Sequence, residues 1–221
     1  MKMVESRCGA LCSQCEYREH ANCKGCIVIK KPIWGESCPV KSCCEDRGYQ
    51  HCGQCSEFPC GLLNEFAYDK EHGDDGKRIE TCCLWHMKEQ AKVKGFDVDK
   101  FISDVVAQNA DILRMHFDPN AAICWHDSNE QFTLDEYIRV NCEFPGKWSG
   151  EIQRVELIDD GVVTVAKISS NESVHLVTSF IKLTKGKINR LDEYFSDCGE
   201  PPAWRQGMNI GKHIGAKRSI H

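Results

Sequence analysis

The sequence predicts an α+β protein in which a small, metal-crosslinked cysteine-rich domain precedes a larger domain of helices and a curved antiparallel sheet. Three observations support this fold class. Eleven of the sixteen cysteines lie between Cys8 and Cys60. Apolar residues then recur at helical spacing after Asp97. Four segments after Gly150 have the composition of strands and are separated by turn residues. We place the domains at residues 1–95 and 96–210, followed by a mobile tail at 211–221.

The cysteines of the first domain are arranged mainly as Cys-x2-Cys pairs. The segments read CGALCSQC, CKGC, CPVKSCC and HCGQCSEFPC, and between them the chain is short, charged and without helical or strand periodicity. Such a segment cannot fold by apolar burial alone. A Cys-x2-Cys turn presents two sulfurs from one tight knuckle, and two knuckles complete the tetrahedral site that Zn²⁺ prefers. The spacing therefore predicts metal binding.

The motif predicts two zinc ions but leaves the assignment of sulfurs open. One set of four is expected to be Cys12, Cys15, Cys23 and Cys26. The second is expected to combine Cys52 and Cys55 with two of the neighbouring thiols, for which we take Cys38 and Cys43 with Cys8, Cys44 and Cys60 as alternates. His51 is a further substitute in the second set. An iron–sulfur cluster is the main alternative cofactor, because it too is held by thiolates.

Composition argues against several partners and compartments. Residues 1–95 carry equal numbers of basic and acidic side chains, and the net charge of −5 comes entirely from residues 96–221. Without a basic excess, nucleic acid is not an expected partner. The first residues lack the apolar core of a secretory signal, and no run approaches the ~18 apolar residues of a membrane span. We expect a cytoplasmic protein without a membrane partner, where reduced thiols favour metal ligation over disulfides.

The first domain is expected to contain few regular elements. Residues 25–29 are consistent with a short strand, and residues 62–68 with a helix after Pro59. A longer helix is predicted from Lys77 to Lys94, ended by Gly95. The cysteines on this helix and beyond it are interpreted as small, buried or half-buried apolar residues rather than ligands; they are Cys82, Cys83, Cys124, Cys142 and Cys198.

The second domain is expected to begin with helices. Asp97 or Asp99 caps a helix that reaches about His116, and Asp118-Pro119 ends it. A short strand at 121–125 is followed by a capping box at Thr133–Glu136, which opens a helix to about Cys142. Four antiparallel strands complete the domain, at residues 150–157, 161–169, 174–183 and 188–195.

Two resemblances to known families extend this interpretation. CGALCSQC, CKGC, CPVKSCC and HCGQCSEFPC resemble a bacterial and archaeal cysteine-rich domain family of unknown function, presumed to bind zinc, and the resemblance extends to about residue 94. The stretches AAICWHDSNEQFTLDEYIRVNCEFPGKW and KINRLDEYFSDCGEPPAWR resemble the SnoaL-like branch of the nuclear transport factor 2-like superfamily. The second resemblance implies a cone, formed by a curved sheet wrapped around helices, with a pocket at its wide end.

The superfamily resemblance implies a ligand pocket without choosing its chemistry. Such cones host cyclases, isomerases, dehydratases and epoxide hydrolases as well as proteins without catalysis, and they commonly dimerise through the sheet. The candidate catalytic residues are His126, Asp192 and Glu193, and the candidate ligand-binding residues are Trp125, Asn141, Tyr194 and Trp204, with His175 a further polar group. Strand alternation places Asp192 and Tyr194 on one face and Glu193 on the other. No clear Asp–Arg–Asp set of the epoxide-hydrolase kind is present.

These observations favour a protein with a structural zinc-binding module and a cone domain that binds a small, mostly apolar ligand. The first alternative is an enzyme of the cyclase, isomerase or hydrolase type that uses a pocket carboxylate. The second is an interaction protein whose metal module responds to metal or redox state. A homodimer formed through the sheet is an expected assembly. The sequence names no substrate.

Overall fold

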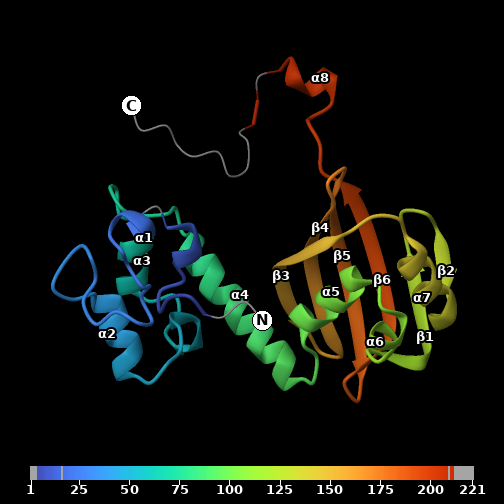
Figure 1. Ribbon diagram of the computed structural model, residues 1–221, viewed down its shortest axis with the longest axis horizontal. Helices are drawn as coiled ribbons and strands as arrows, with labels where there is room; N and C mark the ends of the chain where they lie inside the picture. The colour runs from blue at the N-terminus through green and yellow to red at the C-terminus, as the bar shows by residue number, and fades with distance from the viewer. Residues whose placement is uncertain (1–3, 16, 209, 212–221) are drawn as a thin grey trace.

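The cysteine-rich part (residues 4–76) and the sheet part (residues 96–198) lie at opposite ends of one long helix, α4 (Lys77–Val93) (Figure 1). The computed structural model describes residues 4–15, 17–208 and 210–211. Apart from residue 211, the tail that we expected to be mobile lies outside the described residues. None of the helices in the described part of the chain is long and apolar enough to cross a membrane.

The cysteine-rich part consists of short elements joined by turns. They are the 3-10 helix η1 (Cys12–Gln14), α1 (Tyr17–His20), α2 (Pro39–Asp46), the 3-10 helix η2 (Cys52–Gln54) and α3 (Gly61–Ala67). Its buried apolar cluster is small and centres on Cys38, Val40 and Leu63. So little apolar burial cannot by itself order a segment of this length.

The prediction of a short strand at residues 25–29 is wrong. The segment is a turn in which the amides of Val28 and Ile29 both donate to the carbonyl of Gly25, at 3.0 and 3.1 Å. Gly25 has a φ of +94°, a backbone conformation that a residue with a side chain rarely adopts. The glycine thus turns the chain where the apolar residues after it suggested an extended segment.

The prediction for α4 is confirmed, and the helix contributes to two apolar clusters. It begins after Gly76 and ends before Gly95, both with φ of +88°. Ile79 near its start packs against the small cluster of the cysteine-rich part. Ala91, near its end, is completely buried in the large core of the sheet part. The domain boundary at Gly95 stays a prediction, because α4 belongs to both clusters.

The helix expected from Asp97 to His116 is interrupted. Asp97 caps α5 (Val98–Ala107) by accepting a hydrogen bond from the amide of Lys100, as predicted. Gln108 then adopts a left-handed φ of +54° and ends the helix. The side chain of Asn109 accepts the amide of Ile112 and starts a second helix, α6 (Ala110–Arg114). Side-chain capping therefore divides what apolar periodicity suggested was one helix.

The sheet has six strands in the order β2-β1-β6-β5-β4-β3. The four-strand antiparallel meander is confirmed as β3 (Ser149–Ile158), β4 (Gly161–Ser169), β5 (Val174–Thr184) and β6 (Lys187–Asp197). β1 (Phe117–Trp125) pairs in parallel with β6, and the short β2 (Glu130–Phe132) pairs with β1. Asp118 and Pro119, which were expected to end the preceding helix, lie within β1.

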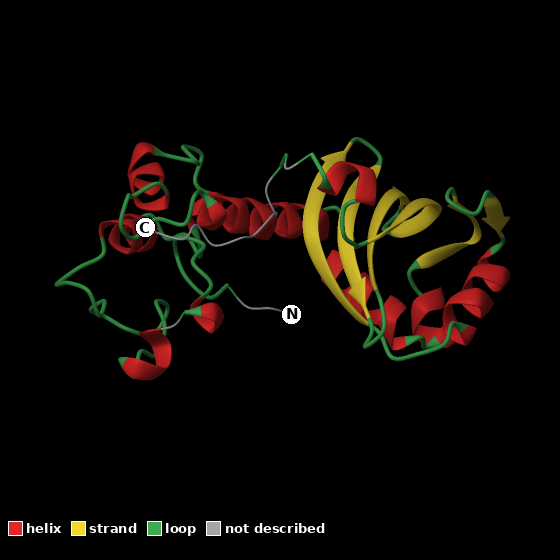
Figure 2. Ribbon diagram, turned by 90° about the horizontal axis from the view of Figure 1, so that it is seen from above, coloured by secondary structure: helices red, strands yellow, loops and turns green. Residues whose placement is uncertain are grey.

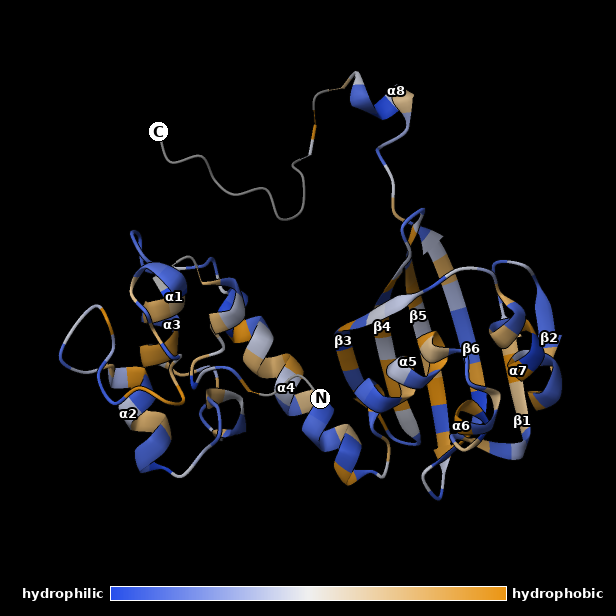
Figure 3. Ribbon diagram, in the orientation of Figure 1, coloured by the Kyte–Doolittle hydropathy of each residue, from blue (hydrophilic) through white to orange (hydrophobic). Residues whose placement is uncertain are grey.

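The curved sheet is covered on one face by α5, α6 and α7 (Leu134–Glu143) (Figure 2). The predicted capping box at the start of α7 is confirmed, because Thr133 and Glu136 exchange hydrogen bonds. Apolar residues of the central strands and of these helices form the large core (Figure 3). We call the face of the sheet that α5, α6 and α7 cover the helix-covered face. A short helix, α8 (Ala203–Gln206), follows the sheet.

Candidate functional site: cysteine clusters and a buried carboxylate

Five cysteines surround a small hollow in the cysteine-rich part. The hollow has a volume of about 20 Å³, close to the room that one water-sized sphere needs. The sulfur-bearing residues of its lining are Cys43, Cys44, Cys52, Cys55 and Cys60. All five belong to the second expected ligand set or to its alternates, and their role as ligands stays a prediction. Cys38 does not line the hollow and is instead buried in the small apolar cluster.

Short helices bring these sulfurs together. Pro39 starts α2, which carries both Cys43 and Cys44. The Cys52-x2-Cys55 knuckle is closed by a hydrogen bond of 3.0 Å from the amide of Cys55 to the carbonyl of Cys52. Nη1 of Arg47, at the end of α2, donates to Sγ of Cys55 at 3.4 Å.

The first expected ligand set is partly assembled. The amide of Cys26 donates a hydrogen bond to the sulfur of Cys12, which also lies within electrostatic reach of Cys8 and Cys15. Burial nevertheless raises the pKa of the Cys12 thiol. Cys15 is exposed, and Cys23 is half-buried at the start of the second knuckle. The knuckle geometry around Cys12 and Cys26 resembles what a metal thiolate needs, with an amide directed at the sulfur.

The donor chemistry fits a thiolate-bound metal, but the ligands are not drawn together. In the part of the chain that the structure describes, no three His, Cys, Asp or Glu side chains are grouped closely enough to hold an ion. All sixteen cysteines lie in that part and are free thiols. A hollow lined by sulfur and of ionic size suits Zn²⁺, which binds four thiolates at about 2.3 Å. Iron–sulfur clusters use the same donors.

The sheet part contains one buried carboxylate on its helix-covered face. Glu193 on β6 is 7% exposed. Its Oε2 accepts a hydrogen bond of 2.9 Å from Nε1 of Trp125, and its Oε1 accepts one of 3.0 Å from the hydroxyl of Ser179. Burial raises the pKa of Glu193, and the two donors oppose that rise. Asp127 raises the pKa further.

Aromatic side chains surround this carboxylate. The ring of Trp125 makes edge contacts with Phe132, Tyr137 and Phe195, at centroid distances of 4.9 to 6.3 Å. Tyr137 is 1% exposed, and burial raises the pKa of its phenol well above the usual value. The environment of Glu193 is thus apolar apart from its two hydrogen-bond donors.

The other two catalytic candidates lie on the opposite face of the sheet. Nε2 of His126 is 2.9 Å from Oδ1 of Asp192, and the guanidinium of Arg190 donates two hydrogen bonds to the same carboxylate. Arg190 holds the pKa of Asp192 below its usual value. The ring of Tyr194 stacks on His126 at 4.4 Å. Alternation along β6 therefore separates Glu193 from His126, Asp192 and Tyr194, so these four cannot form one site.

The remaining candidates do not converge on Glu193. Asn141 on α7 is half-buried, and its Oδ1 is buried without a partner among the described atoms. Trp204 lies on α8 and is 71% exposed, so the expectation that it lines a pocket is not met. His175 pairs with Asp197 at 2.8 Å and with Ser173 at 3.0 Å, at the start of β5.

A second hollow lies between β2 and α7. It is an open depression of about 420 Å³ lined by Glu130, Gln131, Phe132, Glu136, Arg139, Val140 and Glu143. Arg139 is occupied by an ion pair with Glu143 at 2.9 Å. Sequence reasoning missed this depression, because it forms where a strand that was not predicted approaches the capped helix.

Sequence reasoning also missed Ser179, the second partner of Glu193. Its position directly opposite Glu193 follows from the register of β5 and β6. The turn at Lys185–Gly186, where both residues have positive φ, was the only sequence signal for that register.

The cysteine-rich part of the chain matches a known protein family. Residues 4–65 match the family described as "Protein of unknown function (DUF3795)". The expected resemblance to a cysteine-rich family of unknown function is confirmed over that range, which ends before the limit of about residue 94 that we expected. No curated protein matches the chain.

Among solved structures, the sheet part is similar to nuclear transport factor 2-like and SnoaL-like proteins. An NTF-2 like protein of unknown function from Burkholderia xenovorans LB400 is 23% identical, with a TM-score of 0.47, over 58% of this chain and 99% of that one. A SnoaL-like protein from Jannaschia sp. CCS1 is 15% identical, with a TM-score of 0.41, over 48% and 85%. An NTF2-like protein of unknown function from Cytophaga hutchinsonii ATCC 33406 is 17% identical, with a TM-score of 0.39, over 45% and 86%.

Proposed function

We propose that the cysteine-rich part is a metal-binding module, held together by thiolate-bound zinc. The observation that carries this proposal is the sulfur-lined hollow, where five cysteines from three short segments line a volume of about 20 Å³. The small size of the apolar cluster beside it supports the same conclusion, because metal–ligand bonds replace the missing core. Cys43, Cys44, Cys52, Cys55 and Cys60 would supply the ligands there. Zinc provides a crosslink and no redox chemistry; an iron–sulfur cluster is the alternative occupant.

We further propose that the sheet part binds a small, mostly apolar ligand near Glu193. The support is a carboxyl group with a raised pKa, set among aromatic rings and oriented by Trp125 and Ser179. Such a group can donate a hydrogen bond in its neutral form or accept a proton in its charged form. The same property makes an enzyme of the isomerase, cyclase or hydrolase type the second candidate, with Glu193 as its general acid or base.

Metal analysis tests the first proposal. We expect freshly purified protein to contain about two zinc ions per chain, the number that eight thiolates can hold at four per ion. Elemental analysis by mass spectrometry measures both zinc and iron in one sample. Iron with acid-labile sulfide in place of zinc would identify the alternative occupant. Protein free of both metals, purified under reducing conditions without chelator, would show that the module is not a metal site.

The pH dependence of stability tests the environment of Glu193. Its carboxyl binds a proton more tightly in the folded protein than in the unfolded chain, because burial raises its folded pKa. Its contribution to the free energy of unfolding is therefore complete at low pH and decreases as the pH rises from the ordinary glutamate range, near 4.3, through the raised folded pKa. Glu193→Gln, which cannot ionise, is expected to remove this decrease.

Denaturant unfolding at several pH values measures this effect. Glu172→Gln is the matched control, because Glu172 is exposed in the loop before β5. The control should follow the wild-type pH profile. If Glu193→Gln and the wild type lose stability in parallel as the pH rises, the buried carboxylate is not the titrating group. That result would contradict the proposed role of Glu193 in the ligand site.

A further inference from the structure

Cys82 on α4 is completely buried, whereas its neighbour Cys83 is exposed. From the sequence both were interpreted as small apolar residues. Cys82 also lies outside residues 4–65, which match the cysteine-rich family. The segments packed around Cys82 nevertheless lie within residues 4–65 and carry cysteines of that range.

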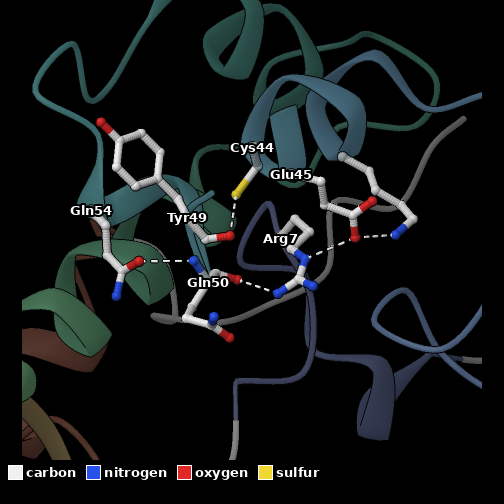
Figure 4. A network of polar contacts seen from close by, with 7 residues as sticks. Arg7, Cys44, Glu45, Tyr49, Gln50 and Gln54 are labelled. Atoms are coloured by element: carbon white, nitrogen blue, oxygen red, sulfur yellow. Dashed lines mark hydrogen bonds and ion pairs between the residues drawn. The ribbon is translucent and has the colours of Figure 1, made fainter. Parts of the chain in front are cut away.

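The segment Arg7-Cys8-Gly9 connects three other cysteines. The carbonyl of Arg7 accepts a hydrogen bond of 2.8 Å from the amide of Cys52. The side chain of Arg7 donates to Glu45 at 3.1 Å and to the carbonyl of Gln50 at 2.8 Å (Figure 4). Glu45 follows Cys44 directly in α2, and Sγ of Cys44 approaches the carbonyl of Tyr49 at 3.4 Å (Figure 4). Arg7 therefore fixes Cys8 between α2 and η2.

Gly9 brings the same segment against α4. A Cβ atom built at Gly9 would lie 1.9 Å from the carbonyl oxygen of Arg78 and 2.9 Å from Sγ of Cys82. Gly9 also has a φ of +90°, so only glycine fits this approach without strain. The backbone next to Cys8 thus touches the sulfur of Cys82.

The knuckle at Cys52 approaches Cys82 from another direction. A Cβ at Gly53 would lie 2.3 Å from the carbonyl oxygen of Cys82. The thiol of Cys82 lies within electrostatic reach of Cys8 and Cys44. The thiol of Cys52 lies within the same reach of Cys8, Cys44 and Cys82.

We propose that Cys8, Cys44, Cys52 and Cys82 form a four-thiolate metal centre, in which Cys82 is the ligand contributed by α4. This inference rests on the proposed metal binding of the cysteine-rich part. Binding one divalent ion would form four metal–sulfur bonds and release the thiol protons to solvent. Four sulfurs without water match the closed coordination of structural zinc sites. We call this set the α4 cluster. Its sulfurs would draw together on binding the ion, and Cys43, Cys55 and Cys60 would remain as ligands for an ion in the hollow.

The α4 cluster would join the two parts of the molecule. The other metal ligands of the cysteine-rich part come from residues before Gly61, so they crosslink that part only to itself. Cys82 lies on the helix that contributes Ala91 to the large core of the sheet part. A metal bond to Cys82 would therefore fix the start of α4, and the packing of its end would transmit that restraint to the sheet.

The test compares Cys82→Ser with Cys83→Ser, two equivalent changes at adjacent positions. We expect Cys82→Ser to lose about one metal ion relative to the wild type, or to bind it more than about tenfold more weakly in competition with a chromogenic chelator. Cys83→Ser should keep the wild-type metal content. Cobalt-substituted protein gives a second measurement, since thiolate-to-cobalt absorption should weaken only in Cys82→Ser.

A measurement on the unmodified chain covers the case in which Cys82→Ser fails to fold. In the cadmium-substituted wild type, NMR should detect scalar coupling between the metal nucleus and the β protons of Cys82, and none for Cys83. Wild-type protein that holds metal without this coupling, together with a Cys82→Ser variant of unchanged metal content, would overturn the α4 cluster alone. Wild-type protein without metal would instead refute the metal-binding proposal on which it rests.

Discussion

Removing metal from the reduced protein with a strong chelator is expected to unfold the cysteine-rich part while the sheet part stays folded. The cysteine-rich part has only a small apolar cluster around Val40 and Leu63. Structural zinc supplies roughly 10–16 kcal/mol of apparent binding free energy in small zinc domains, which exceeds the whole stability of most domains. The sheet part has a large core that contains no metal ligand. Loss of metal should therefore affect the two parts very differently.

Hydrogen exchange measured by mass spectrometry resolves this difference along the chain. Peptides from α2, η2 and α3 should lose nearly all protection after chelation, whereas peptides from β4, β5 and β6 should keep theirs. The start of α4 is expected to exchange faster as well, and its end only slightly. Zinc added back should restore the protection. Equal protection of α2 and α3 with and without chelator would contradict the proposal that metal holds this part together.

Replacing Ala91 by aspartate is expected to destabilise the sheet part by about 3–5 kcal/mol, the usual effect of an unpaired charge placed in a core. Ala91 is completely buried where the end of α4 meets the large core. Nearby contacts hold the helix in this position: Lys88 pairs with Asp99 at 2.7 Å, and Nζ of Lys94 donates to the carbonyl of Ile158 at 2.6 Å. The buried residues of this core are apolar, so none of them could neutralise the new carboxylate.

Val93→Asp is the matched control, two residues further along the same helix. Val93 is 82% exposed, so the same charge there should change stability by less than about 0.5 kcal/mol. Denaturant unfolding monitored by the sheet signal in circular dichroism measures both variants. Equal, small effects would show that the end of α4 does not belong to the core of the sheet part, and the helix would then not connect the two parts.

Much of the fold could be predicted from local sequence chemistry. The capping box at Thr133 and Glu136 marks the start of α7, and Asp97 marks the start of α5. The turns that end β3 and β5 are indicated by the turn-forming sequences Asp159-Asp160-Gly161 and Lys185-Gly186-Lys187, so the order of the meander could be derived. Each of these features is decided by residues close together in the chain.

What could not be predicted depends on contacts between distant residues or on unusual backbone conformations. The parallel pairing of β1 with β6 joins strands some seventy positions apart, such as Ile123 and Leu191, and carries no local signal. Gln108 adopts a left-handed conformation that its side chain does not favour, so the break between α5 and α6 was hidden. The same limit applies to the turn after Gly25.

For the candidate sites too, local sequence predicts some features, and others depend on how distant segments pack. Cys-x2-Cys spacing predicts the metal-binding region, but which sulfurs meet depends on how α2, η2 and α4 pack, and Cys82 has no motif of its own. Alternation along β6 predicts that Glu193 and Asp192 face opposite sides, and the structure agrees. It does not say which side the helices cover. Only the packed fold shows that Glu193 is the buried carboxylate and that His126 lies on the other face.

The most direct test of the central claim, that thiolate-bound metal holds the cysteine-rich part together, is X-ray absorption spectroscopy of the purified protein at the edge of the metal it contains. We expect the zinc edge to show a shell of about four sulfur atoms at about 2.3 Å, with little contribution from nitrogen or oxygen. An iron edge with iron–iron scattering would show that the thiolates hold an iron–sulfur cluster instead of zinc. A metal surrounded by nitrogen and oxygen, or a sample without bound metal, would contradict the claim.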